Sequence, residues 1–352
     1  RDLRMSRGLG DVYKRQEFFT FPLNHKEKDK TFRDFAIECL DVDKTKTDQE
    51  VFKACFEYFM SIPESGFAEN DRLKKVLTWI NNKDVNIHYD KKPSLFSSEN
   101  VFAGVITGGK YGEDGILSNM EDKNQCQVLG RKKPVLKYFY IFVYLPINHN
   151  EGFFMIHSNS HEETITNIFR DYIATVFTKG EYKRPIVSKF CPKKFQDEFK
   201  NGALLTSFNF KTTFLDTIPS DDPILQEIDK FDINITITPS KKAQIPWNAA
   251  EKLMSIIGKH QFKGDKGSKE LEDFDKVRMK THNEGAKSSK SFSWDTKDKE
   301  FTPVVYLEGL TDIKYYTDGT PDFDTLKTYT MSLFNNEILP EIRKDLYVKK
   351  FD

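Results

Sequence analysis

Cysteine is scarce in this sequence, and its spacing is uninformative. The four cysteines are Cys39, Cys55, Cys126 and Cys191, and no two of them form a CxxC pair. A zinc ribbon needs closely spaced cysteine pairs, and a small secreted scaffold needs several disulfides. The cysteine pattern therefore argues against both classes of protein.

The chain also lacks an excess of charge of either sign. It has 54 basic and 54 acidic residues. A strongly basic chain would be expected to bind phosphates over much of its surface, and this chain is not one. Any contact with nucleic acid must therefore come from a local group of basic residues.

Long hydrophobic runs are missing too. No apolar run reaches the roughly 18 residues that a membrane span needs, and no signal peptide is recognisable. We therefore expect a cytoplasmic protein that contacts no membrane. Hydrophobic residues still make up 38% of the chain, and the 31 Phe among them can form a large core.

Catalytic motifs are absent or incomplete. There is no GxSxG elbow, and GVITGGK (104–110) has the GxxxxGK spacing of a phosphate-binding loop but not its context. Tyr111 stands where Ser or Thr would hold Mg²⁺, and no helix pattern follows. A glycine-rich strand end is the favoured interpretation. The sequence identifies no cofactor.

The acidic stretch PDFDTLK (321–327) superficially resembles nuclease motifs. Proline and aspartate are also common at the start of a helix, where they suit the backbone angle and the helix dipole. The helix start is the simpler interpretation.

The first residues do not look like part of the fold. DVYKRQ (11–16) back-translates in one frame to a transposon end used in sequencing adapters, and SRGLG (6–10) continues into the adjoining primer. Residues 1–16 thus resemble a translated adapter, and we expect this segment to pack against nothing. A disordered basic tail is the alternative.

Hydrophobic spacing in the rest of the chain predicts an α+β protein, with mixed or antiparallel sheets and packed amphipathic helices. We expect strands at 17–23, 86–90, 100–107, 136–145, 153–157 and 231–239, and helices at 48–60, 70–80, 162–178, 247–258 and 321–339. A hairpin is predicted from 274–282 and 290–296. A weak boundary divides the chain into domains at 17–217 and 225–352, and a single domain is the alternative.

The strand at 136–145 is aromatic on one side, where Tyr138, Tyr140, Phe142 and Tyr144 alternate with apolar residues. An open aromatic face of this kind stacks bases in some RNA-binding sheets. A continuous apolar run is more typical of a central strand that is covered on both faces, which is the favoured interpretation.

A histidine and carboxylate cluster follows that strand. His157, His161 and Glu162 are candidate metal ligands, with His149 and Glu163 nearby. The four-residue spacing of the two histidines crosses from a strand end into a helix cap, so the single helix face of an HExxH site is absent. Surface residues at a turn are the favoured alternative.

The predicted hairpin carries the best candidate for a nucleic-acid contact. Lys276, Arg278 and Lys280 alternate along its first strand, and its loop and second strand add Lys287 and Lys290. Cations on one ribbon can bind phosphates. Lysines that keep an edge strand from aggregating are the alternative.

Three stretches carry a resemblance to a known family: GGKYG, YFYIFVYLPINHNEGFFMIHSNS and YTDGTPDFDTLKTYTMSLF. From about residue 104 to 340 the chain resembles an uncharacterised bacterial family sometimes found near phage-defence genes. The resemblance implies a fold and a genomic neighbourhood, and it assigns no site residue. The richness in Lys, Asn and Phe fits a low-GC bacterium or its phage.

Two hypotheses about function follow. The first is a non-enzymatic binding or regulatory protein, such as a defence-associated accessory that contacts nucleic acid or a protein partner. The alternative is a metal-dependent hydrolase or nuclease whose histidines and carboxylates come from distant parts of the sequence.

Overall fold

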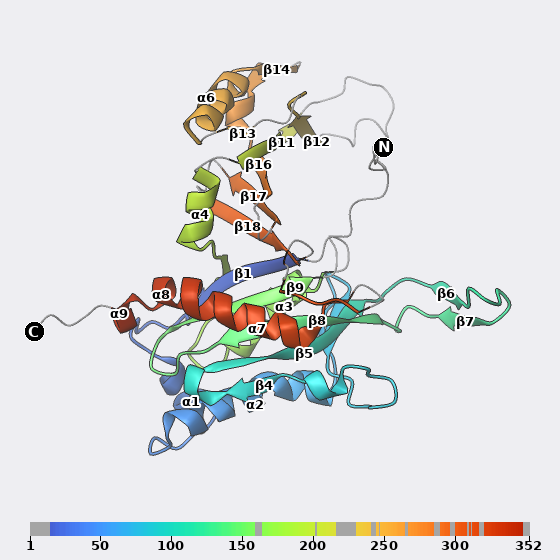
Figure 1. Cartoon of the computed structure of the whole chain (residues 1–352), viewed down its shortest axis with the longest axis vertical. Helices are drawn as coiled ribbons and strands as arrows, with labels where there is room; N and C mark the ends of the chain where they lie inside the picture. Colours follow the sequence, from blue (N-terminus) through green and yellow to red (C-terminus); the bar gives the residue numbers. More distant parts are fainter. Residues whose placement is uncertain are drawn as a thin grey trace, which may run out of the picture. The chain divides into compact units, whose positions relative to one another are not determined.

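The computed structural model describes residues 15–158, 164–200, 203–215, 230–240, 244–245, 247–264, 267–284, 289–295, 300–307, 310, 312–316 and 320–347. The fold is α+β, as the sequence predicts, and the strands pair antiparallel (Figure 1). The chain groups into two compact units. Unit 1 comprises residues 1–188 and 311–332, and unit 2 comprises residues 189–310 and 333–352.

These units are defined by contacts within the folded chain. They do not test whether residues 17–217 and 225–352 fold independently, so the predicted domain boundary stays a prediction. Among the described residues, no helix is both long enough and apolar enough to span a membrane.

Unit 1 contains one main sheet and its covering helices. Its strands are β1 (Arg15–Pro22), β2 (Ala68–Asn70), β3 (Lys75–Thr78), β4 (Ser94–Phe96), β5 (Val101–Lys110), β6 (Gly115–Ser118), β7 (Cys126–Leu129), β8 (Val135–Tyr144) and β9 (Glu151–Ser158). Its helices are α1 (Phe32–Cys39), α2 (Asp48–Ser65), α3 (Thr166–Val176) and α7 (Phe323–Leu333), with short 3-10 turns at Tyr89–Lys91 and Ser97–Glu99. The strand order is β1-β9-β8-β5-β3-β2, with β4 also on β5.

Strand β8 lies inside this sheet, as predicted for 136–145. Phe139, Ile141 and Val143 point to the face that α1, α2 and α3 cover, and all three are buried. The face of α3 predicted to be apolar, which includes Phe169 and Ile173, belongs to the same core. Its start falls later than the predicted residue 162, and the predicted cap at 160–163 lies outside the described residues.

The aromatic face of β8 is covered as well. Tyr140, Phe142 and Tyr144 are buried. Helix α7 lies across this face, where the rings of Phe323 and Tyr140 stack with centroids 6.4 Å apart (Figure 1). The Gln16 side chain also donates a hydrogen bond to Thr330 of α7. The base-stacking interpretation of this strand is therefore wrong.

The predicted helix at 70–80 is wrong. The chain there forms β2, a turn in which Lys74 has a φ of 49°, and β3. Val76 and Leu77 are both buried because β3 lies between β2 and β5 with both faces covered. A short strand that is buried on both faces shows no two-residue alternation of apolar and polar side chains. The spacing of the apolar residues at 70–80 therefore matched a helix by coincidence.

The predicted strand at 86–90 is also wrong, since the chain turns there and enters a 3-10 turn. The Asn82 and Asn86 side chains accept hydrogen bonds from the backbone N–H groups of Asp84 and His88. Such local bonds compete with a strand ladder and favour turns.

Strand β1 begins two residues before the predicted one. Arg15 and Gln16 pair with Ser158 and His157 of β9, and Gln16 is fully buried. The expectation that all of residues 1–16 pack against nothing is therefore wrong for these two residues. Residues 1–14 lie outside the described part of the chain.

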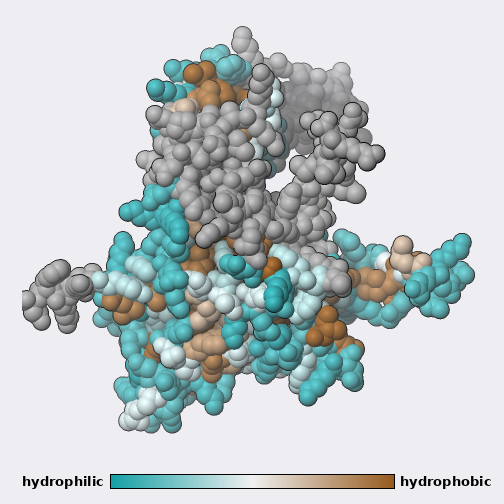
Figure 2. Space-filling view, in the orientation of Figure 1, coloured by the Kyte–Doolittle hydropathy of each residue, from teal (hydrophilic) through white to brown (hydrophobic). Residues whose placement is uncertain are grey.

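The β6–β7 hairpin carries exposed apolar side chains. Ile116 and Val128 are cross-strand neighbours, and each is 70% exposed, while Met120 between the strands is fully exposed. Figure 2 shows this apolar surface in brown. A two-stranded ribbon with so little burial gains little stability of its own.

The main strands of unit 2 also pair antiparallel. Its strands are β11 (Ala203–Leu215), β12 (Lys230–Ile237), β13 (Gln244–Ile245), β14 (Gln261–Gly264), β15 (Gly267–Glu270), β16 (Lys276–Glu284), β17 (Ser289–Asp295) and β18 (Glu300–Tyr306). Its helices are α4 (Lys193–Lys200), α6 (Trp247–Gly258), α8 (Leu339–Ile342) and α9 (Lys344–Tyr347), with a π-helical turn at Phe334–Ile338 and a 3-10 turn at Leu271–Asp273. The short strand β10 is Ser188–Lys189.

The main strand order in unit 2 is β12-β11-β16-β17-β18, with β13 on β11. The predicted hairpin, the strand at 231–239 and the helix at 247–258 are all confirmed. One face of the sheet is apolar, where Phe208 and Phe210 of β11 pair with Met279 and Val277 of β16 and all four are buried. Phe274 packs edge-on against Phe210.

Candidate functional site

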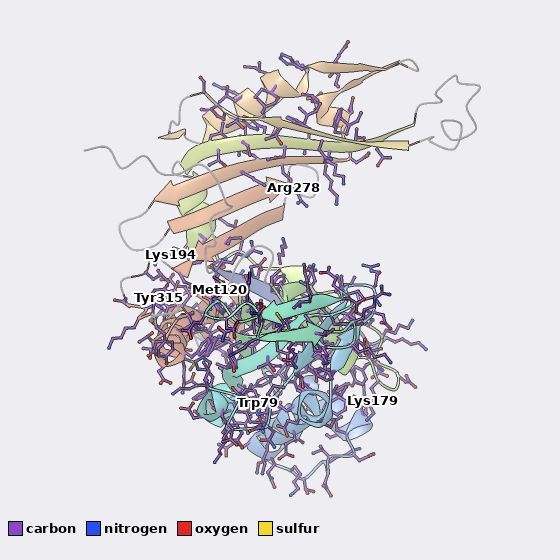
Figure 3. The ribbon with its side chains drawn as sticks, turned by 90° about the vertical axis from the view of Figure 1, so that its right-hand side faces the viewer. Trp79, Met120, Lys179, Lys194, Arg278 and Tyr315 are labelled. Atoms are coloured by element: carbon purple, nitrogen blue, oxygen red, sulfur yellow. The ribbon has the colours of Figure 1, made fainter. Side chains whose placement is uncertain are left out.

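The outward face of β16 carries a row of cations. Lys276, Arg278 and Lys280 are exposed, whereas Val277 and Met279 between them are 2% and 0% exposed. Alternation along a strand places successive outward side chains about 6.5 to 7 Å apart. The geometry that the sequence predicted for these three residues is present. Arg278 is labelled on this sheet in Figure 3.

Neighbouring strands extend the polar face. Lys211 of β11 is exposed and stands directly opposite Lys276, and Asn209 stands opposite Arg278. Thr236 of β12 donates a hydrogen bond to Asn209. We call Lys211, Lys276, Arg278 and Lys280 the basic face.

For the other two predicted cations, a place in this group stays a prediction. Lys287 lies outside the described residues. Lys290 of β17 is paired with Asn283 of β16 and with Val305 of β18. In the strand register, Asp295 of β17 is directly opposite Arg278, and Asp232 of β12 is directly opposite Thr213. Acidic positions therefore adjoin the basic face.

The structure describes only part of the candidate metal cluster. His157 lies near the end of β9, fully buried beside the Phe323 ring, whereas His149 lies in the turn before β9. The strand between them holds these histidines roughly 25 Å apart. His149 Nδ1 accepts a hydrogen bond from the backbone of Glu151. His161 and Glu162 lie outside the described residues, within which no group of three metal-binding side chains occurs.

The acidic stretch at 321–327 forms a helix start. Asp322 Oδ1 accepts hydrogen bonds from the backbone N–H groups of Asp324 and Thr325 in the first turn of α7. Asp324 makes an ion pair of 2.6 Å with Lys91. Both carboxylates have structural partners, as the simpler interpretation requires.

The GVITGGK stretch is the end of strand β5. Gly109 lets β8 approach closely, because a Cβ at this position would lie 1.7 Å from the carbonyl oxygen of Val135. No helix follows Lys110, so the loop-and-helix geometry of a phosphate-binding loop is absent.

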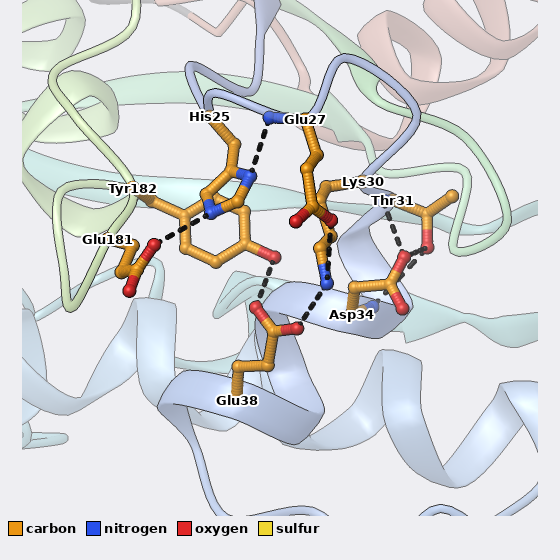
Figure 4. A network of polar contacts seen from close by, with 8 residues as sticks. All are labelled: His25, Glu27, Lys30, Thr31, Asp34, Glu38, Glu181 and Tyr182. Carbon is orange, nitrogen blue, oxygen red and sulfur yellow. Dashed lines mark hydrogen bonds and ion pairs between the residues drawn. The ribbon is translucent and has the colours of Figure 1, made fainter.

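A network of ionisable side chains lies beside α1 (Figure 4). Glu38 accepts hydrogen bonds from Lys30 at 2.6 Å and from the Tyr182 hydroxyl at 3.0 Å. The hydrogen bond from Lys30 holds the pKa of Glu38 below its usual range. His25 accepts a bond from the backbone of Glu27. The network ties the 24–31 loop to α1, and it explains these residues without a ligand.

Comparison with known proteins adds no assignment. No family model matches the chain, and the comparisons with curated proteins and with solved structures found no match. The resemblance to a family found near phage-defence genes therefore stays a prediction.

Proposed function

We propose that this chain is a non-enzymatic nucleic-acid-binding protein that contacts phosphates through the basic face of unit 2. The observation that carries the proposal is the alternation along β16. The three cations are exposed while Val277 and Met279 hold the strand in the core. The family resemblance suggests a role as a defence-associated accessory.

The spacing of these cations supports phosphate contacts. Side chains two residues apart on a strand are about 6.5 to 7 Å apart, which is close to the phosphate separation in an extended single strand. Lys211 widens the row across the sheet, so a backbone could follow β16 or cross from β16 to β11. Binding of this type reads charge and shape, and it needs no catalytic group.

The test is a filter-binding titration with single- and double-stranded DNA and RNA of one length, at two salt concentrations. The variant replaces Lys276, Arg278 and Lys280 with Gln. Each lost phosphate contact on a single strand should reduce the slope of log affinity against log salt by about 0.7, so the three changes should reduce it by about 2.

The matched control replaces three exposed lysines of unit 1, Lys53, Lys132 and Lys133, with Gln. It removes the same charge and should leave the salt slope unchanged. No retention of any nucleic acid at low salt would refute the proposal and favour a protein partner. An unaltered slope in the β16 variant would equally refute this face as the contact surface.

A further inference from the structure

A groove of about 710 Å³ lies on unit 1, along one side of α3. Its floor includes Asn167, Arg170, Asp171 and Ala174, which are three or four residues apart in succession and so form one stripe of the helix. Seven residues of helix span about 10 Å. The floor is therefore long enough for about three residues of an extended chain.

Two segments that are distant in the sequence form the walls of the groove. One is the turn between β2 and β3, with Arg72 and Leu73, and the other is residues 184–187. Asn70 Oδ1 accepts a hydrogen bond of 2.9 Å from the backbone N–H of Leu73, and Asn70 Nδ2 donates one of 2.8 Å to Asp171. The turn is thus fixed to α3 without a ligand, so binding requires little further ordering of this wall.

The charges of the groove are unequal. Its described lining residues include three arginines and one acidic residue, and that residue, Asp171, pairs with Arg184. Arg72 is exposed, and its side chain makes no ion pair or hydrogen bond with any described residue. Arg170 donates a hydrogen bond of 2.8 Å to the carbonyl oxygen of Val187, and its Nε is buried with no partner among the described residues. A carbonyl oxygen supplies no countercharge, so two of the arginines lack a carboxylate partner in the described part of the chain.

The groove also offers apolar and amide groups. Ile186 is 74% exposed in one wall, and Asn167 is exposed on the floor. An amide side chain can both donate to and accept from a peptide backbone. The described lining residues include no aromatic ring, so they provide nothing on which a base could stack. These features favour a peptide ligand over a nucleic acid.

We propose that this groove binds a short acidic segment of another protein, in which a carboxylate stands next to an apolar side chain. Guanidinium groups bind carboxylates through paired hydrogen bonds, and Arg72 and Arg170 supply two such groups. The apolar side chain of the ligand packs on Ile186. Charge complementarity of this kind selects the partner. The site lies in unit 1 and does not rest on the basic face.

The test first selects ligands for the full chain from a displayed library of random eight-residue peptides. Asp and Glu next to Leu, Ile or Val are expected to be enriched among the selected peptides. The most frequent peptide is then labelled, and fluorescence anisotropy measures its affinity. Arg72→Gln should weaken binding at least about tenfold, because hydrogen bonds between charged groups are lost. Arg72 lies in an exposed turn, so this change does not touch the core.

Two controls locate the effect. Lys132→Gln removes one exposed charge elsewhere in unit 1 and should bind the peptide as the unaltered chain does. Replacing Lys276, Arg278 and Lys280 with Gln removes the cations of β16 and should also leave the peptide affinity unchanged. Retained peptide binding in that variant separates the groove from the surface proposed to bind nucleic acid.

Several outcomes would overturn the proposal. One is a selection that enriches no peptide, or only peptides without acidic residues. Another is equal affinity in a folded Arg72→Gln variant, checked by circular dichroism. Loss of peptide binding in the β16 variant would place the peptide on unit 2 instead. Single-stranded DNA or RNA that displaces the peptide, and whose own binding Arg72→Gln weakens, would identify the groove as a nucleic-acid site.

Discussion

The two units use their sheets in different ways. In unit 1 both faces of β8 are buried, under α1, α2 and α3 on one side and under α7 on the other. In unit 2 one face of β16 is apolar and the other exposes three cations. In a sheet that is covered on both faces, charged side chains are found toward the strand ends, where Lys75 stands opposite Lys110. A sheet with one exposed polar face can contact a ligand along the middle of its strands.

The largest expected effect is in the core of unit 1. Phe169 is fully buried on α3, with the Phe154 ring 5.2 Å away. Replacing Phe169 with Ala should lower the free energy of unfolding by about 3 to 5 kcal/mol, because a large cavity replaces the ring. Urea unfolding followed by circular dichroism measures it, and Asn167→Ala on the exposed side of α3 is the control. A loss below about 1 kcal/mol would mean that α3 does not cover the sheet.

The next prediction compares neighbours on β16. Met279→Ala should cost about 2 to 5 kcal/mol, because Met279 is fully buried. Arg278→Gln should change stability by no more than about 0.5 kcal/mol, since the exposed face has no core contact to lose. The same urea titration gives both values. Equal costs at the two positions would show that β16 does not alternate between core and surface, and would remove the contrast with unit 1.

Much of this contrast could be predicted from the sequence. The alternation in 274–282 gave the orientation of Lys276, Arg278 and Lys280 correctly, because a strand with one covered face has a clear two-residue period. The continuous apolar run at 136–145 likewise indicated a strand that is covered on both faces.

The pairing of Lys75 with Lys110 could not be predicted, because the chain at 70–80 forms β2 and β3 and not a helix. Lys75 was assigned to a helix at 70–80, and a helix would not have set it opposite Lys110. Lys211 was missed because β11 was not predicted at all.

A smaller effect should be confined to unit 1. Thr47 caps α2, and its side chain and that of Glu50 exchange hydrogen bonds with each other's backbone N–H groups. Thr47→Ala should cost about 1 kcal/mol, whereas Thr47→Ser keeps the hydroxyl and should cost less. Hydrogen exchange followed by mass spectrometry should show faster exchange in peptides from α2 and an unchanged rate of exchange in peptides from β16. Faster exchange in β16 peptides would show that the two units unfold together.

The smallest effect distinguishes the units by the sign of their response to acid. In unit 1, hydrogen bonds from Lys46 and then from Thr47 lower the pKa of Glu50 from 4.5 to about 2. Its folded form binds the proton less well than the unfolded chain does, so this carboxylate stabilises the fold above pH 4.5, and the contribution disappears as the pH falls toward about 2. In unit 2, burial raises the pKa of Glu341 above 4.5. Its ionised form therefore destabilises the fold, and this cost appears as the pH rises from 4.5 through the raised pKa.

Thermal unfolding of Glu50→Gln and Glu341→Gln at pH 7, 4 and 3 tests both signs. At pH 7, Glu50→Gln should melt below the unaltered chain and Glu341→Gln at or above it. Gln still accepts the hydrogen bond from the backbone of Lys193. Both differences should shrink toward zero as the pH falls, because the two carboxyl groups become protonated and then resemble the neutral amide. Differences of the same sign at pH 7 would mean that the environments of these carboxylates do not differ as described, and the contrast between the units would then rest on their sheets alone.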